Sequence, residues 1–327
     1  MSQSPSTTIS RETANGTLRR HGAGGPRWHG HGYNRASLYR LAEALSVVPR
    51  GLRLSLARQV GRIAPRFLPL ERRAIQKTLA LVTGASGDRL DELTAGVFRD
   101  FAMCFADLVS TNRQSVARLA SLVGSVSGAE HFDKLPGGIV SVTAHVGNWE
   151  LAGRLLASRL ARPTNVVVSA AEDPELGRWV RRDGEGIRFV PRAHPSVGVE
   201  LLRALRRGEV VALQADRAIG TGGDVRVPFF GAVAPFPLGP FLLARAAGVP
   251  VVPAFCVLDR RYRYAVKIAT PITVRRGEEE KAAGEWVAIL ESVVRDHPTQ
   301  WFNFFDAWNP FGAPPPSEER PTVRPPS

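Results

Sequence analysis

A histidine and a glutamate lie close together where an apolar run meets a helical pattern. His145 follows the apolar run 138–143, and Gly147 allows a tight turn after it. Asn148 has the character of a helix N-cap, and Glu150 falls in the first predicted helical turn. The Glu150 carboxylate is therefore predicted to fold back onto the imidazole, fixing its tautomer and stabilising the imidazolium that forms on proton abstraction.

This pair predicts acid–base chemistry without a covalent enzyme intermediate. No serine or cysteine is evidently paired with His145, so direct attack by a substrate hydroxyl fits the pattern better than a protein nucleophile. Taken alone, the same residues also fit a histidine and a glutamate that only cap a helix.

The elements around the pair alternate between strand and helix. Strands are predicted at 138–143, 165–169, 187–191 and 209–214, with helices from 148, from 174 and over 196–207. A strand pair that fits an antiparallel arrangement follows at 249–258 and 262–269, and then a helix over 278–295. This alternation predicts an α/β fold with a central mixed, mostly parallel sheet flanked by helices. His145 then lies past the carboxyl end of a strand, where such sheets bind ligands.

An amphipathic helical segment is predicted before the sheet. Apolar residues recur at helical spacing from 37 to about 82, interleaved with arginines, and a further helix is predicted over 89–110. The arginines are Arg40, Arg50, Arg53, Arg58, Arg62, Arg66, Arg72 and Arg73. Such helices either lie on a membrane surface or pack on the core with solvated basic faces, and the pattern leaves both open.

Domain boundaries follow from composition. Residues 1–34 and 310–327 are predicted to be disordered tails, rich in small polar residues and in proline respectively. One domain is predicted over 35–309, with N-terminal helices over 35–122 and the α/β core over 123–309.

The charge of the chain favours an anionic partner. Its 327 residues carry 43 Lys+Arg against 30 Asp+Glu, a net charge of +13, which suits nucleic acid or an anionic membrane. No zinc-finger spacing, RNA-recognition aromatic motif or helix-turn-helix pattern is present, so nucleic acid is disfavoured. No apolar run of about 18 residues predicts a spanning helix, and no signal peptide is evident. Cys104 and Cys256 stand apart, so neither a disulfide nor a metal site is expected.

Several motifs, in the same order, resemble one enzyme superfamily. The His-x4-Glu segment 141–150 resembles the first motif of the lysophospholipid acyltransferase superfamily. Further segments resemble the branch of the lipid A late (lauroyl/myristoyl) acyltransferases and the mycobacterial phosphatidylinositol mannoside acyltransferases: 210–217, 227–231, 237–245, 248–253 and the aromatic closing segment 300–308. The resemblance spans residues 36 to 308.

The resemblance implies an O-acyltransferase domain over 35–309. It implies transfer of a fatty acyl chain from acyl-CoA or acyl carrier protein to a hydroxyl of a glycolipid or lysophospholipid, with no cofactor. The enzyme is expected to be a monomer that lies peripherally on the cytoplasmic face of a bacterial membrane with anionic lipids. His145 would be the general base and Glu150 its orienting carboxylate.

The resemblance also implies substrate-binding residues. Asp216 and Arg217 match a polar pair at the mouth of the site, although an ordinary ion pair fits them too. An arginine that binds phosphate or stabilises the oxyanion is expected among Arg178, Arg181 and Arg182, with Arg181 or Arg182 favoured. Asn148 is a further candidate for substrate binding.

Departures from the branch leave the acceptor open. A polar tail replaces the apolar N-terminal anchor of the lipid A enzymes, and the segment 303–306 lacks the expected basic residues. Phe229, Phe230 and Phe236 are candidates for an acyl-chain groove, and core packing explains each equally well. The glycine-rich segment 220–224 is predicted to be a mobile lip. A thioesterase or esterase that uses the same pair with water remains the alternative function, and a membrane scaffold without catalysis is a weaker one.

Overall fold

The computed structural model of the chain describes residues 40, 44, 47–111, 114–160, 162–168, 186–220 and 222–311. The predicted tail 1–34, the residues after 311 and the candidate arginines Arg178, Arg181 and Arg182 lie outside the described residues. The domain boundaries therefore remain a prediction.

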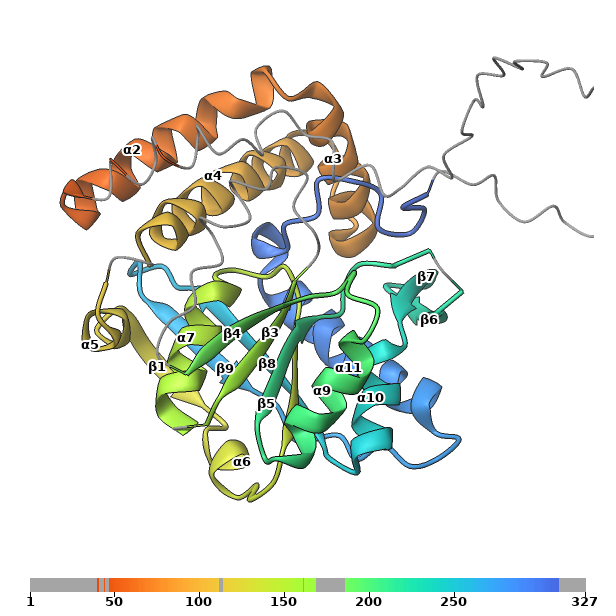
Figure 1. Cartoon of the computed structure of the whole chain (residues 1–327). Coiled ribbons are helices and arrows are strands. Elements are labelled where there is room, and N and C mark those ends of the chain that lie inside the picture. The colour runs from red at the N-terminus through yellow and green to blue at the C-terminus, as the bar shows by residue number, and fades with distance from the viewer. Residues whose placement is uncertain are drawn as a thin grey trace, which may run out of the picture.

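In the described chain, a group of helices comes first, and strands mixed with helices follow from β1 (Val123–Ser127) onward (Figure 1). The helices are α2 (Arg50–Ile63), η3 (Ala64–Arg66), α3 (Pro69–Thr83), α4 (Gly87–Thr111), α5 (Val116–Ala120), α6 (Glu130–Asp133), α7 (Trp149–Leu160), α9 (Val197–Arg206), α10 (Gly239–Ala247), α11 (Glu279–Asp296) and η4 (Pro298–Gln300). The strands are β1 (Val123–Ser127), β2 (Ile139–Thr143), β3 (Thr164–Val168), β4 (Ile187–Pro191), β5 (Val210–Gln214), β6 (Asp224–Phe229), β7 (Ala232–Pro237), β8 (Val251–Leu258) and β9 (Tyr264–Ile268).

Within the described residues, seven strands form one sheet in the order β1-β9-β8-β2-β5-β3-β4. The pairs of β2 with β5 and β8, of β3 with β4 and β5, and of β1 with β9 are parallel, whereas β8 and β9 are antiparallel. The predicted α/β fold class, with its mixed and mostly parallel sheet, is thus confirmed, as is the antiparallel late pair. Strand β1 and the separate hairpin β6–β7 were not predicted.

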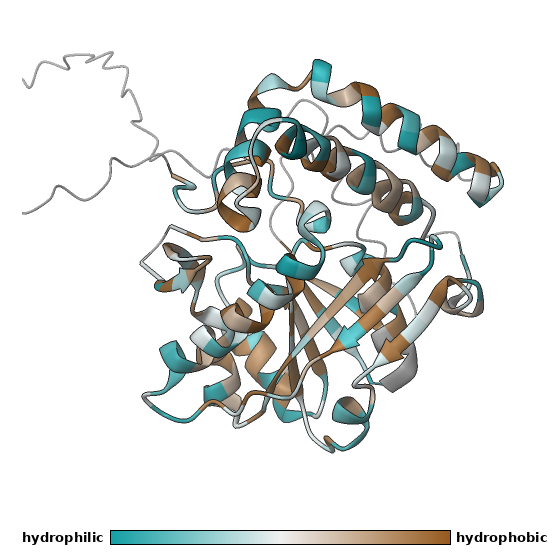
Figure 2. Ribbon diagram, turned by 180° about the vertical axis from the view of Figure 1, so that it is seen from behind, coloured by the Kyte–Doolittle hydropathy of each residue, from teal (hydrophilic) through white to brown (hydrophobic). Residues whose placement is uncertain are grey.

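Apolar side chains from both faces of the sheet form the core. The central strands carry mostly hydrophobic residues (Figure 2), and every residue of β8 is buried. Because parallel strands with helices on both faces bury both sets of side chains, their sequences read as continuous apolar runs. Helices α9, α10 and α11 pack side by side, with α9 against β5 and α10 against β2 and β8, whereas α7 packs against β3 and β8 and contacts α4 and α5.

The N-terminal helices form a layer of their own above the sheet (Figure 1). The predicted helical segment is confirmed where it is described, and it divides at η3, where Pro65 and Pro69 exclude a continuous helix. Helix α2 crosses α4 at Gly61, where a Cβ atom would lie 2.7 Å from the backbone of Arg99. The layer also contacts η4, which leads into the closing segment.

The sequence pattern placed the arginines of α2 on a basic outer face of the helix. Two of them lie elsewhere. Arg50 and Arg53 point inward onto the carboxylate of Asp107 in α4, with nitrogen–oxygen distances of 2.7 and 3.1 Å. The hydroxyl of Tyr264 donates to the same carboxylate at 2.9 Å. A buried carboxylate needs such compensation, so these two arginines fix α2 to the core.

Candidate active site

The turns after β2 and β5 bring two polar residues together. The two strands are parallel neighbours in a register that pairs Thr143 with Gln214, and the Ala215 N–H extends the ladder by donating to the Thr143 carbonyl at 3.0 Å. Residues two positions beyond these strand ends, His145 and Asp216, are therefore adjacent. The chain leaves β2 toward α7 and leaves β5 toward the β6–β7 hairpin, so the two connections diverge at this edge of the sheet, where such sheets bind ligands.

His145 and Asp216 form a hydrogen-bonded pair. The Nδ1 atom of His145 lies 2.7 Å from Oδ1 of Asp216, and the His145 backbone N–H donates to Oδ2 at 3.0 Å. The indole N–H of Trp301 also donates to Oδ2 at 3.0 Å. The carboxylate is fully buried, whereas the imidazole side chain keeps 13% of its exposure. In the described part of the chain, Nε2 of His145 has no hydrogen-bond partner, so it is the nitrogen that a substrate can reach.

The combined effect of burial and neighbouring charges shifts the pKa of both His145 and Asp216 downward. Burial, followed by the positive charge of Arg217, lowers the pKa of His145, and the Asp216 carboxylate only partly offsets this. Burial raises the pKa of Asp216, but the hydrogen bonds and charge of His145, together with the charge of Arg217, outweigh it and hold this pKa well below its ordinary range. A neutral imidazole with an oriented Nε2 lone pair is suited to act as a base.

The turn that carries His145 is held by backbone contacts on both sides. The Phe302 N–H donates to the His145 carbonyl at 2.8 Å, and the Gly147 N–H donates to the Gln300 carbonyl at 2.9 Å. The Asn148 N–H donates to the Cys256 carbonyl at 2.8 Å. The ring of Trp149 meets the imidazole edge to face, with centroids 5.1 Å apart. Backbone and ring contacts thus fix the orientation of the histidine.

Arg217 connects this turn to the closing segment. Its Nε donates to Oδ1 of Asn303 at 3.2 Å, and its Nη2 donates to the Phe302 carbonyl at 3.0 Å. Its guanidinium carbon lies 5.4 Å from the ring centroid of Phe305, within cation–π range. The hydrogen bonds of the two residues predicted as a polar pair thus lead to different partners: Asp216 bonds His145 and Trp301, whereas Arg217 bonds the closing segment.

Comparisons with known proteins agree with this arrangement. The profile of a family described as bacterial lipid A biosynthesis acyltransferase matches residues 37–309, which is most of the chain. The chain belongs to this family. The resemblance predicted from the sequence motifs is thereby confirmed.

Individual relatives and one solved structure are similar to parts of the chain. Two curated proteins, from two strains of Mycobacterium tuberculosis, are named phosphatidylinositol mannoside acyltransferase, and each is 28% identical over 216 residues. That match covers 62% of this chain and 64% of each relative, so the chain matches less than two thirds of their length. The crystal structure of a 1-acyl-sn-glycerophosphate acyltransferase from Thermotoga maritima aligns with 78% of this chain and 100% of that one. Its TM-score is 0.38 at 15% identity, too low to infer shared geometry.

The carboxylate at Nδ1 of the histidine is not the one predicted. Asp216, which is 71 positions away in sequence, occupies the place that the sequence analysis gave to Glu150. Glu150 lies half-buried in the first turn of α7, where its charge acts on Arg154 one turn later. A role for Glu150 in this acyltransferase family member remains a prediction.

Other predicted site residues lie in the core. Asn148 is confirmed as an N-cap, because its Oδ1 accepts the Leu151 N–H at 3.1 Å. Its Nδ2 donates to the Tyr264 hydroxyl at 3.3 Å and its side chain is buried, which disfavours direct substrate binding. Phe229 and Phe236 are also buried, in an aromatic cluster with Trp301, so core packing explains both; Phe230, at a turn with φ +50°, is half-buried.

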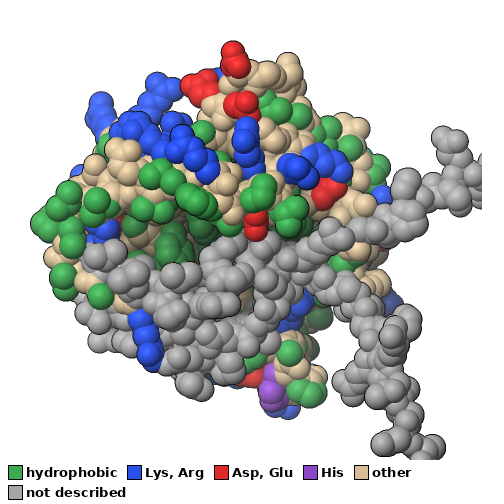
Figure 3. Space-filling view, turned by 90° about the horizontal axis from the view of Figure 1, so that it is seen from above, with side chains coloured by type: hydrophobic (Ala, Val, Ile, Leu, Met, Phe, Trp, Pro, Cys, Tyr) green, Lys and Arg blue, Asp and Glu red, His purple; other side chains and the backbone are tan. Residues whose placement is uncertain are grey.

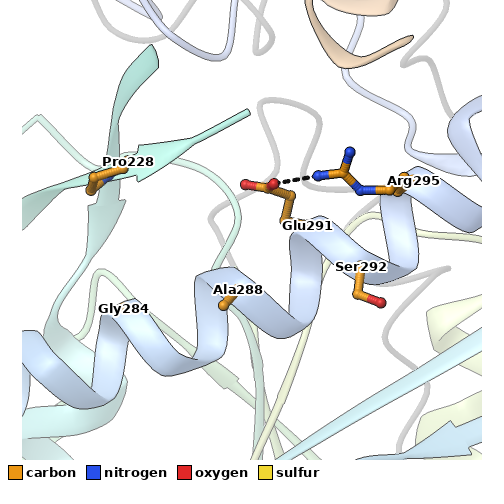
Figure 4. Close-up of a pocket in the computed structure, with 6 residues that line it drawn as sticks. All are labelled: Pro228, Gly284, Ala288, Glu291, Ser292 and Arg295. Atoms are coloured by element: carbon orange, nitrogen blue, oxygen red, sulfur yellow. Dashed lines mark hydrogen bonds and ion pairs between the residues drawn. The ribbon is translucent and has the colours of Figure 1, made fainter. Parts of the chain in front are cut away.

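A pocket on the described surface lies between a strand of the hairpin and the last long helix. A cavity of about 250 Å³ lies between β6 and α11, lined by Pro228, Gly284, Ala288, Glu291, Ser292 and Arg295 (Figure 4). Glu291 accepts the Phe230 N–H at 2.8 Å and pairs with Arg295 at 2.6 Å. The pocket therefore adjoins the β6–β7 turn and does not include His145.

Two further observations concern the cysteines and possible metal ligands. Cys104 and Cys256 form no disulfide, and both are buried. Burial raises the pKa of each thiol, so neither offers a reactive thiolate. Among the residues that the structure describes, no three His, Cys, Asp or Glu side chains form a group able to hold a metal ion.

At the predicted lip 220–224, the carboxylate of Asp224 accepts hydrogen bonds from the backbone N–H groups of Ile219 and Gly220.

Sequence reasoning missed Trp301 as a partner of Asp216. A buried indole N–H usually finds an acceptor, and this tendency was the available signal, but the motif alone does not say which acceptor lies nearby.

We expect Gly147→Ala to destabilise the protein and disrupt the His145 turn. Gly147 has φ +59°, and a Cβ atom would lie 2.0 Å from the Cys256 carbonyl oxygen. The backbone strain alone costs about 1–3 kcal/mol, and the clash adds to it. Denaturant unfolding measures the loss. Gly153→Ala in α7 is the control, because nothing lies within 4 Å of the added methyl group, and its free energy of unfolding is expected to stay equal or rise. Equal stability of the two variants would contradict the prediction.

Proposed function

We propose that the protein is a membrane-associated O-acyltransferase. It moves a fatty acyl chain from the thioester of acyl-CoA or acyl carrier protein to a hydroxyl of a glycolipid or lysophospholipid. The observation that carries this proposal is the His145–Asp216 pair, with Nε2 open to substrate, in a chain of the lipid A biosynthesis acyltransferase family.

His145 acts as the general base in this proposal. Its Nε2 takes the proton of the acceptor hydroxyl while the acceptor oxygen bonds to the thioester carbon. Asp216 holds the proton on Nδ1 and stabilises the imidazolium that results. When the tetrahedral intermediate collapses, the carbon–sulfur bond breaks and the thiol leaves with the proton from His145. The two buried cysteines take no part.

Several supporting roles are part of the same proposal. Glu150 serves as a second carboxylate of the site, and Arg217 stabilises negative charge beside His145. Arg181 or Arg182 binds a phosphate of donor or acceptor. No metal or cofactor is required. The names of the relatives favour a glycolipid acceptor, such as a phosphoinositide mannoside, over a lysophospholipid.

An acyl-transfer assay tests the proposal. Radiolabelled acyl-CoA, and acyl carrier protein in parallel, is supplied with a membrane lipid extract, and products are separated and weighed by mass spectrometry. A labelled lipid that depends on His145 supports the transfer, and its mass identifies the acceptor. Release of free fatty acid alone, with or without lipid acceptor, would instead indicate a hydrolase.

The proposed membrane contact lies on the outer face of α2, η3 and the start of α3. Six large apolar residues there recur at helical spacing and are 47% to 75% exposed: Leu52, Leu56, Val60, Ile63, Phe67 and Leu70. We call them the outer ridge. Arg62, Arg66 and Arg73 are exposed on the same segment, and Figure 3 shows basic and hydrophobic side chains next to each other on this face.

This combination supports peripheral binding to an anionic bilayer. Apolar side chains gain free energy on entering the acyl boundary, and each arginine near an anionic surface adds about 1 kcal/mol. In the described part of the chain, no helix has the length and apolar character needed to cross a bilayer. The cytoplasmic face is the side that the proposal assigns, because acyl-CoA and acyl carrier protein are found there.

We expect Phe67→Ser/Leu70→Ser to weaken vesicle binding by at least a factor of ten. These side chains are 75% and 73% exposed, and full burial of one such side chain is worth about 1.5–3 kcal/mol. Co-sedimentation with vesicles containing anionic lipid, over a range of salt, measures the effect. The control, Val199→Ser/Val233→Ser, removes exposed apolar residues outside the ridge and should bind like wild type. If the wild type binds neutral vesicles as tightly as anionic vesicles at every ionic strength, the electrostatic part of the proposed membrane contact is contradicted.

A further inference from the structure

Residues of the closing segment alternate between two environments. Trp301 donates to Asp216, Asn303 accepts from Arg217, and the Arg217 guanidinium lies over Phe305. The intervening residues Phe302 and Phe304 instead pack against aromatic rings of α4, with centroid separations of 5.3 Å and 5.8 Å. Asn303 therefore faces the Asp216–Arg217 turn, on the same side of the segment as the tryptophan that contacts the buried carboxylate.

The side-chain amide of Asn303 is only half satisfied. Its side chain is 1% exposed, and its Oδ1 accepts from Nε of Arg217 at 3.2 Å. This bond fixes the orientation of the amide, because an arginine can only donate. The Nδ2 group is buried and has no hydrogen-bond partner in the described structure. Buried donors without an acceptor are costly and rare in native proteins, and functional sites are among the places where they occur.

The position of this donor connects it to the reaction. The backbone N–H of the preceding residue, Phe302, donates to the His145 carbonyl at 2.8 Å, and the Phe302 carbonyl accepts from Arg217. The Asn303 amide is thus bound to a guanidinium whose charge is felt by His145, and it lies one residue after the backbone contact with the His145 turn. A donor fixed in advance beside a positive charge is the arrangement that stabilises developing negative charge.

We propose that Asn303 is a catalytic residue whose Nδ2 donates a hydrogen bond to the carbonyl oxygen of the acyl thioester as that oxygen becomes negatively charged. This inference rests on the proposed acyl-transfer function. As the acceptor oxygen bonds to the acyl carbon and its proton passes to His145, the carbonyl electron pair moves onto this oxygen. When the carbonyl re-forms, the carbon–sulfur bond breaks and the thiolate takes the proton from His145. Asn303 forms no covalent bond at any stage.

The deciding variant is Asn303→Asp. Aspartate has nearly the same shape and still offers Arg217 an acceptor oxygen, but it replaces the free donor with an acceptor. Removal of one such donor typically lowers kcat by about 10²–10³-fold, with KM for the acyl donor unchanged, because the hydrogen bond forms in the transition state. Since a new negative charge also raises the pKa of His145, kcat is compared on the high-pH plateau of each enzyme. Asn303→Ala, which lacks both the donor and the new charge, should show a similar loss.

Asn309→Asp is the matched control, because Asn309 is exposed and lies six positions further along the chain, directly after the closing segment. It should retain the kcat of wild type. A rise in KM with unchanged kcat in the Asn303 variants would overturn the proposal, since Asn303 would then bind only the ground state. If Asn303→Asp and Asn303→Ala both lose activity and their thermal unfolding midpoints shift by the same amount, the role of Asn303 is structural and the proposal is overturned. Wild-type protein without any acyl transfer would instead refute the proposed function itself, whereas active wild type and fully active Asn303→Asp would refute only the role of Asn303.

Discussion

His145→Ala is expected to lower kcat for acyl transfer by about 10²–10⁴-fold, the usual contribution of a positioned general base. The variant removes Nε2, the nitrogen of the His145–Asp216 pair that has no protein partner in the described structure. The fold should persist, because the His145 backbone N–H still donates to Asp216 and its carbonyl still accepts from Phe302. Single-turnover acyl transfer, measured beside a thermal unfolding scan, separates the two effects.

The pH dependence of wild-type activity provides a second test of the role of His145 as general base. A histidine that acts as a base works only while it is neutral, so activity falls as the pH drops through its pKa. Burial and Arg217 lower the pKa of His145, and the midpoint of the acid limb of kcat/KM should therefore lie below the ordinary histidine value of about 6.5. His194→Ala, which removes an exposed histidine, should leave both rate and profile unchanged. A His145→Ala variant with wild-type turnover would refute the mechanism.

Local sequence patterns predicted the elements that position the site. The apolar runs at 138–143 and 209–214 differ from β2 and β5 by one residue at the start and by none at the end, because buried parallel strands need continuous apolar side chains. The position of His145 past the end of β2 and the N-cap role of Asn148 followed from the same local reading. Such inferences succeed because they depend only on residues close in sequence.

The partner of His145 could not be derived in this way. Glu150 was chosen because it lies within reach along the chain, whereas Asp216 is brought in by the register of β2 against β5. Register depends on which strands become neighbours, and that is decided by packing of the whole sheet. The outward orientation of the outer ridge was equally hidden, because the pattern of α2 does not reveal that Arg50 and Arg53 face the core through Asp107.

Asp216→Asn should lower kcat by as much as about 10⁴-fold, the loss seen when the carboxylate of a histidine–aspartate pair is replaced by an amide. Oδ2 of Asp216 accepts from the His145 backbone N–H and the Trp301 indole, so the amide oxygen of asparagine would keep that side. The amide nitrogen would then face Nδ1, 2.7 Å away in the wild type, and could only donate to it. The imidazole proton would move to Nε2, which leaves no lone pair to accept the proton of the substrate.

Comparison of Asp216→Asn with Glu150→Gln assigns the orienting carboxylate. Since Asp216 is the side chain at Nδ1, its variant should lose more activity than Glu150→Gln, measured as kcat under identical conditions. The acid limb of any residual activity in Asp216→Asn should also move to lower pH, because the carboxylate that raises the pKa of His145 is gone. Asp224→Asn is the matched control: its carboxylate also accepts backbone N–H groups but lies at the loop after the site. If Glu150→Gln proves the more damaging change while both proteins stay folded, the orienting role belongs to Glu150, and the Asp216 contact is structural.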